Sequence, residues 1–194
     1  MGCNLLAEEL VEGQRDLRPL IESLRGLPDD VQSILDSSAA ESLVDDYADS
    51  DDYFFIGRGT NVAVALEGAL KCKEISYEHA EGFPAGELKH GPLALVTPET
   101  PVFAIVTGDD ERAQKTLGNI KEVQARGAPV IAVTDGRSAA DEIADETLKI
   151  PETTKRAAPV LANVQLQLFS YHLADALGRP IDKPRNLAKS VTVE

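Results

Sequence analysis

The chain has 194 residues, 43% of them hydrophobic, and a formal net charge of -14 from 19 basic and 33 acidic side chains. This length and composition indicate one globular domain with short appendages and argue against a largely disordered chain. The acidic balance argues against nucleic acid or an anionic membrane surface as a primary partner. Since the sequence shows neither an apolar run of about 18 residues nor a signal peptide, we expect a cytoplasmic protein without a membrane span.

The excess of carboxylates raises a hypothesis about the surrounding solution. In a cytoplasm with high salt, dissolved ions screen the repulsion between like charges, and hydrated carboxylates keep the surface soluble. We therefore expect the stability of the chain to depend on salt concentration.

Two cysteines, Cys3 and Cys72, are too few for a disulfide framework or a zinc site. Cys72 falls among apolar residues of a predicted helix. We expect it to be a buried and unreactive thiol.

Residues 1–50 show a helical and strongly acidic pattern. Apolar residues recur at helical spacing up to Leu24, and Pro28 followed by two aspartates predicts the start of a new helix. Residues 39–48 predict one more helix. Because none of these helices could form a domain alone, we interpret residues 1–50 as a helical connector that lies on another unit.

From residue 51 onward, short apolar runs alternate with helical patterns. The apolar runs predict buried strands at 53–56, 101–106, 129–133 and 147–150. The helical patterns lie at 110–126, 139–144 and 159–177. Strands that alternate with helices indicate an α/β fold, a three-layer α-β-α sandwich with a parallel sheet of four or five strands. We assign this domain to residues 51–178 and a C-terminal tail to residues 179–194.

A charged window follows the first predicted strand. Glu67, Lys71, Glu74 and Glu78 are spaced four, three and four residues apart, so one helix would place all of them on the same face. The spacing alone is typical of a solvated face with weak ion pairs. The position favours a function, because the window leads into a Gly- and Pro-containing loop, and open parallel sheets bind ligands beside such turns.

His90 lies in this polar loop, directly before Gly91. An imidazole there is a candidate general acid or base, although a structural role fits the sequence equally well. His79 and His172 fall in helical patterns and are interpreted as packing residues, and the spacing of the three histidines indicates no metal site. Lys189 is either an exposed lysine on a frayed terminus or, if it is held away from water, a nucleophile for a ketone.

The turn 57–59, Gly-Arg-Gly, begins like a phosphate-binding glycine loop. Position 62, where the third glycine of that motif would stand, is valine. A tight turn is therefore the preferred interpretation.

Three stretches together carry a resemblance to a known family. Residues 66–81 (LEGALKCKEISYEHAE) and 85–95 (AGELKHGPLAL) resemble the C-terminal sugar-isomerase (SIS) domain of the glutamine–fructose-6-phosphate aminotransferases. Residues 183–194 (KPRNLAKSVTVE) resemble the C-terminus of the same family almost letter for letter. The resemblance extends over residues 28–194. It implies a part of an enzyme that converts fructose 6-phosphate, with ammonia from glutamine, to glucosamine 6-phosphate without a metal or organic cofactor.

The resemblance also implies roles for individual residues. Glu74 would move a proton between C1 and C2 of the sugar, His90 would assist ring opening, and Lys189 would form a Schiff base with the C2 ketone. Lys71 would support Glu74 in moving charge and protons. Glu67 and Ala188 would contact the substrate. In the family the histidine loop reaches the active site of a neighbouring subunit, which implies a homodimer.

The chain also departs from the family in ways that bear on its activity. No Ser- and Thr-rich phosphate loop is present, and the turn 107–110 (TGDD) is acidic and expected to repel phosphate. The N-terminal glutaminase cysteine is not reproduced. The chain is then either a fragment or a separately encoded piece of such an enzyme, and we expect catalysis to require a first SIS domain and a glutaminase domain from a partner chain. The alternative is a stand-alone SIS module that binds a sugar phosphate or a partner protein without turnover.

Overall fold

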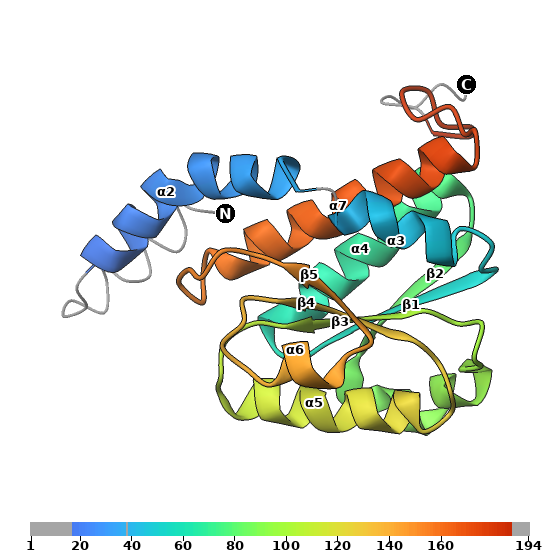
Figure 1. Cartoon of the computed structure of the whole chain (residues 1–194), viewed down its shortest axis with the longest axis horizontal. Helices are drawn as coiled ribbons and strands as arrows, with labels where there is room; N and C mark the ends of the chain where they lie inside the picture. The colour runs from blue at the N-terminus through green and yellow to red at the C-terminus, as the bar shows by residue number, and fades with distance from the viewer. Residues whose placement is uncertain (1–16, 38, 188–194) are drawn as a thin grey trace, which may run out of the picture.

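The computed structural model describes residues 17–187 except Ser38, and it shows a parallel sheet with helices on both faces (Figure 1). The strands are β1 (Asp52–Gly57), β2 (His79–Pro84), β3 (Val102–Val106), β4 (Val130–Thr134) and β5 (Glu146–Lys149). They pair in parallel in the order β2-β1-β3-β4-β5. The prediction of an α/β sandwich with four or five parallel strands is confirmed. The strand order reverses between β1 and β3, and the carboxyl ends of these two strands form the switch point of the sheet.

Two layers of helices cover the sheet. One layer contains α2 (Arg18–Leu35), α3 (Ala39–Tyr47), α4 (Thr60–Ser76) and α7 (Ala158–Ala176) (Figure 1). The opposite layer contains α5 (Glu111–Gln124), α6 (Ala140–Ile143) and the 3-10 helices η1 (Ala85–His90) and η2 (Pro92–Leu95). None of the helices in the described part of the chain is long and apolar enough to cross a membrane.

Each face of the sheet has its own hydrophobic core. Phe55 and Phe103 face the α4 and α7 layer, where their rings stack 4.9 Å apart and Phe103 lies 4.5 Å from the ring of Phe169. Phe54 and Ile56 face the α5 layer. Full burial stabilises each of these side chains by roughly 1.5–3 kcal/mol. Because both faces are covered, the central strands are apolar at consecutive positions, which is why the sequence revealed them.

The structure corrects the prediction that the helix after β1 extends through His79. Helix α4 ends at Ser76, and Tyr77 adopts a left-handed backbone conformation that turns the chain into β2. β2 is an edge strand in which Ala80 is fully buried while Glu81 and Gly82 remain partly exposed. It therefore has no apolar run, and its residues were instead assigned to the helical pattern.

The prediction that a new helix begins at Pro28 is also wrong. Helix α2 continues through Pro28 from Arg18 to Leu35. Proline inside a helix removes a backbone donor and costs about 3 kcal/mol. Leu27 and Val31 flank the proline and pack against the core of the α7 layer, and this burial offsets the lost hydrogen bond.

Candidate active site

The last three turns of α4 carry a close ion pair on their outer face. Lys71 Nζ donates a hydrogen bond to Glu74 Oε2 at 2.8 Å and lies 3.6 Å from Glu67 Oε1. This hydrogen bond raises the pKa of Lys71. Lys71 therefore stays protonated at neutral pH. The three side chains are between 27% and 41% exposed, so a small molecule could reach the carboxylate.

Glu78 does not belong to this face, contrary to the prediction from spacing. It follows the end of α4, and its Oε1 accepts a hydrogen bond from Arg179 Nη2 at 3.0 Å. Two residues four positions apart share a helical face only if the helix contains both of them. Because α4 ends at Ser76, Glu74 and Glu78 do not share one. The charged face of α4 therefore consists of Glu67, Lys71 and Glu74.

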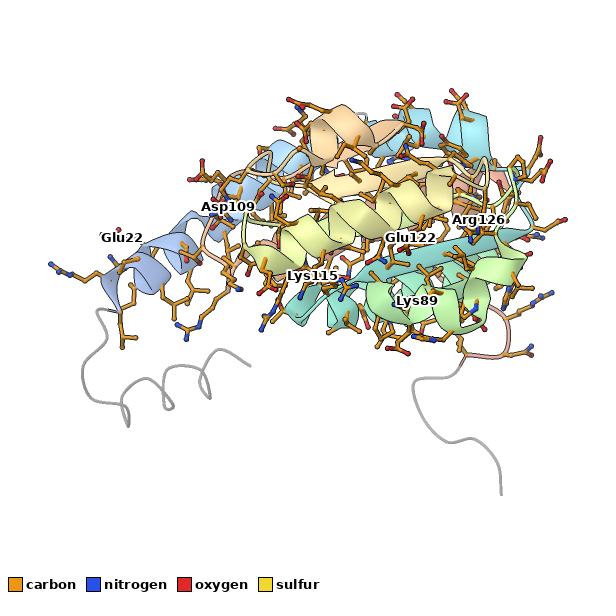
Figure 2. All side chains as sticks on the ribbon, turned by 90° about the horizontal axis from the view of Figure 1, so that it is seen from below. Glu22, Lys89, Asp109, Lys115, Glu122 and Arg126 are labelled. Carbon is orange, nitrogen blue, oxygen red and sulfur yellow. The ribbon has the colours of Figure 1, made fainter. Side chains whose placement is uncertain are left out.

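His90 is the last residue of η1, in the layer opposite α4. Ala85 and Leu88 are fully buried and anchor η1 in the core of the α5 layer, while His90 and its neighbour Lys89 are exposed. Figure 2 shows Lys89 on η1 beside α5, the helix that carries Glu122. No contact of the described residues brings His90 to Glu74, and within one chain the two belong to different layers.

The tail lies against the end of α4 over the part that the structure describes. Arg185 donates its backbone N–H to Tyr77 Oη at 2.8 Å, and Arg179 Nε donates to the backbone oxygen of Ser76 at 3.0 Å. Lys189 and Ala188 lie outside the described residues. Residues near the tail that the sequence had not singled out, Tyr77 and the two arginines, thus connect it to the helix of Glu74.

The switch point of the sheet carries a small polar pocket beyond the ends of β1 and β3. It is lined by hydroxyl, amide and charged groups of Arg58, Thr60, Asn61, Thr107, Asp110, Arg112, Thr116 and Lys155. The expected acidity of the turn 107–110 is partly neutralised. Asp110 caps α5 by accepting the backbone N–H groups of Arg112 and Ala113, and Lys155 donates to it at 2.6 Å, which lowers its pKa.

The turn 57–59 is tight, as the sequence predicted. A side chain at Gly57 would collide with the backbone of Asn61, and Gly59 has a φ of +60°. Arg58 extends from this turn toward α5, where Nε and Nη2 donate to Asn119 Oδ1 at 3.2 and 2.9 Å. The turn therefore joins β1 to the layer that holds η1.

Comparison with known proteins assigns the fold to a family. The family model for the SIS domain, which describes the sequences of that family, matches residues 46–175 of this chain. The chain belongs to the SIS domain family. A solved C-terminal domain of glucosamine-fructose-6-phosphate aminotransferase from Francisella tularensis is similar, with a TM-score of 0.77 and 40% identity over 84% of this chain and 46% of that one.

Curated relatives extend the similarity beyond the SIS domain. The glutamine–fructose-6-phosphate aminotransferase (isomerizing) of Halobacterium salinarum is 54% identical over 180 residues, which are 92% of this chain and 30% of the relative. The enzyme of the same name from Methanosarcina acetivorans is 51% identical over 92% of this chain and 29% of its own length. The chain thus corresponds to about a third of these relatives.

Two histidines and a cysteine that the sequence analysis considered lie among ordinary structural neighbours in this SIS domain. His79 begins β2, where Nδ1 contacts Asp52 Oδ1 and Nε2 lies 3.5 Å from Glu81 Oε1, so its predicted place in a helix is wrong. His172 lies in α7 as predicted, with its ring edge-on to Tyr171. Cys72 is fully buried and burial raises its pKa to about 12, which confirms the buried thiol. Among the described residues no group of His, Cys, Asp and Glu could hold a metal ion.

Proposed function

We propose that this SIS domain is the isomerase part of a glutamine–fructose-6-phosphate aminotransferase, which converts fructose 6-phosphate and ammonia from glutamine to glucosamine 6-phosphate. The observation that carries the proposal is the Lys71–Glu74 pair on a helix whose end also holds the C-terminal tail. A carboxylate beside a fixed ammonium suits the transfer of a proton between adjacent carbons, and the tail carries the candidate amine.

The chemistry divides among three residues. The ε-amine of Lys189 adds to the C2 ketone and water leaves, which gives an imine that ammonia can then attack to release the lysine. Glu74 removes a proton from C1 and returns it to C2, which turns the ketose into an aldose. Lys71 supplies a positive charge beside Glu74 and beside the negative charge that develops on the substrate. Glu67, which lies within 3.6 Å of Lys71, and Ala188, next to Lys189, would contact the sugar.

His90 would act from a neighbouring subunit. Its layer lies across the sheet from Glu74, so a homodimer in which η1 of one subunit faces α4 of the other would complete the site. We propose that this assembly acts in the cytoplasm and also needs the first SIS domain and the glutaminase domain. A strictly monomeric chain in sedimentation experiments at high concentration would contradict the shared site.

Trapping of the imine tests the assignment. Incubation of the chain with fructose 6-phosphate and borohydride should attach a reduced sugar phosphate to Lys189, located by peptide mass spectrometry. Lys189→Arg, which keeps the charge but cannot form the imine, is the matched control. Binding of fructose 6-phosphate without an adduct would refute the enzyme and favour the alternative, a module that binds a sugar phosphate without turnover.

Activity of the isolated chain gives a second test. Without the domains that hold phosphate and release ammonia, the chain alone should form negligible glucosamine 6-phosphate from glutamine. Formation at a full enzymatic rate would show that the site is complete in this chain and would overturn the proposed division of labour.

A further inference from the structure

The junction between α4 and β2 contains an unusual backbone conformation. Tyr77, directly after the last helical residue, has φ 69° and ψ 9°. Among the described residues it is one of two non-glycine residues with positive φ, and the other is Asn186 in the tail. A bulky aromatic residue is unfavourable in this region, so surrounding contacts must hold it there.

Those contacts come from the tail, about a hundred residues away in sequence. The backbone N–H of Arg185 donates to Tyr77 Oη at 2.8 Å, and the guanidinium of Arg185 lies 4.2 Å from the centre of the Tyr77 ring. The guanidinium of Arg179 lies 5.5 Å from the same ring. Hydrogen bonding to the phenol and the attraction of a cation to the ring thus act on one side chain.

Arg179 makes a second set of contacts at the end of α4. It donates to the backbone oxygen of Ser76 and to Glu78 Oε1, both at 3.0 Å. The carbonyl groups of the last helical turn lack partners within the helix, and a cation is favourable there. Arg179 therefore closes the end of α4, whereas Arg185 and Tyr77 join the tail to that end.

We propose that Tyr77 is a positioning residue: by fixing the tail at Arg185 on the end of the helix that carries Glu74, it limits how far the chain that leads to Lys189 can move from that helix end. Tyr77 follows Glu74 by three residues, a rise of about 4.5 Å along a helix. Lys189 follows Arg185 by four residues, and four extended residues span at most about 14 Å. Anchoring Arg185 on Tyr77 therefore sets an upper limit on the distance between the backbone of Lys189 and this helix end. The catalytic part of this inference rests on the proposed function, but the attachment of the tail does not.

Substitutions at Tyr77 can release the tail without harming the turn. Tyr77→Phe keeps the ring and loses the phenol oxygen. Tyr77→Gly removes the ring as well, yet glycine adopts positive φ more readily than tyrosine, so the turn itself should persist. Tyr171→Phe on α7 is the matched control, because Tyr171 is an exposed tyrosine whose ring contacts His172.

Hydrogen exchange of the full chain tests the attachment. In Tyr77→Phe the amide of Arg185 should exchange roughly tenfold faster, since it loses its acceptor. In Tyr77→Gly the amides of Lys183 and of residues 185–187 should all exchange faster; residue 184 is proline and has no amide hydrogen. The melting temperature should change little in both variants. Unchanged exchange of the Arg185 amide in both variants would overturn the proposal.

Borohydride trapping with fructose 6-phosphate tests the positioning of Lys189. The yield of adduct on Lys189 should fall roughly tenfold in Tyr77→Gly and less in Tyr77→Phe, and should stay unchanged in Tyr171→Phe. Faster exchange of the tail with an unchanged yield would refute a role of Tyr77 in positioning Lys189. Binding of fructose 6-phosphate to the unmodified chain without an adduct would refute the proposed function instead, while the exchange experiment would still decide whether Tyr77 holds the tail.

Discussion

Replacement of Gly68 by alanine should destabilise the chain, although alanine is the better helix former. Gly68 lies in α4 at its close contact with α7. A β-carbon there would collide with Cδ1 of Leu166 and lie 3.2 Å from Phe55 Cδ1 and 3.3 Å from Leu166 Cβ. All of these atoms belong to fully buried side chains, so they have little room to move.

The magnitude follows from two opposing effects. Alanine in place of glycine stabilises a helix by about 1 kcal/mol, and overpacking of a core costs about 1–3 kcal/mol. The net loss for Gly68→Ala is therefore about 1 kcal/mol, which lowers the melting temperature by about 2–4 °C for a chain of this size. In a Leu166→Ala background the collision with Cδ1 disappears, and the space it leaves allows the two longer contacts to relax, so Gly68→Ala should then stabilise by about 1 kcal/mol.

A double-mutant cycle measures this change of sign. Urea unfolding of the four proteins should give a coupling of about 2 kcal/mol between positions 68 and 166. Gly118→Ala in the middle of α5 is the control, because a β-carbon at that position would meet open space, and this substitution should stabilise by about 1 kcal/mol. If Gly68→Ala stabilises the unmodified chain as much as Gly118→Ala does, the close packing of α4 on α7 is refuted.

Three further outcomes follow from the charges and the thiol. The hydrogen bond from Lys155 lowers the pKa of Asp110, so the stability that this bond gives is complete above about pH 4 and is lost at lower pH. In Asp110→Asn the melting temperature should therefore fall less steeply with acid than in the unmodified chain. Equal dependence of the two melting temperatures on pH would contradict this. In a Cys3→Ser variant, Cys72 should resist thiol reagents at pH 8 until the chain unfolds, and rapid labelling of the native chain would count against its burial. If the charge of -14 reflects a high-salt cytoplasm, the melting temperature should be higher in molar KCl than in dilute buffer, and equal values would reject that hypothesis.

Much of the fold could be predicted because its central strands are buried on both sides. The apolar runs at 53–56, 101–106 and 129–133 coincide with β1, β3 and β4, whose residues are almost entirely inaccessible. β2 escaped the prediction because it has no run of apolar residues, and Ala80 is its only fully buried residue. The full length of α2 was not predicted, because a proline followed by aspartates normally marks the start of a helix. In the folded chain, packing of α2 against the core beside α7 keeps the helix continuous through Pro28.

The candidate site was predictable only where its parts are close in sequence. Lys71 and Glu74 are one helical turn apart, and spacing places them together. The contact between Tyr77 and Arg185 spans 108 positions, and no periodicity connects such residues. The need for glycine at position 68 is likewise set by Leu166 on another helix. Side-chain chemistry and local periodicity thus identify candidate residues, whereas their neighbours depend on the folded chain.

The two halves of the proposed site rest on separate cores. α4, with Lys71 and Glu74, packs through one face of the sheet, and η1, with His90, packs through the other. Because interiors are close-packed, each half is held in place by the core of its own layer. Within one chain, the sheet therefore separates His90 from Glu74. Assembly of two chains brings such separated surfaces together without deforming either, which is the physical reason to expect the base and the imidazole of one site to come from different subunits.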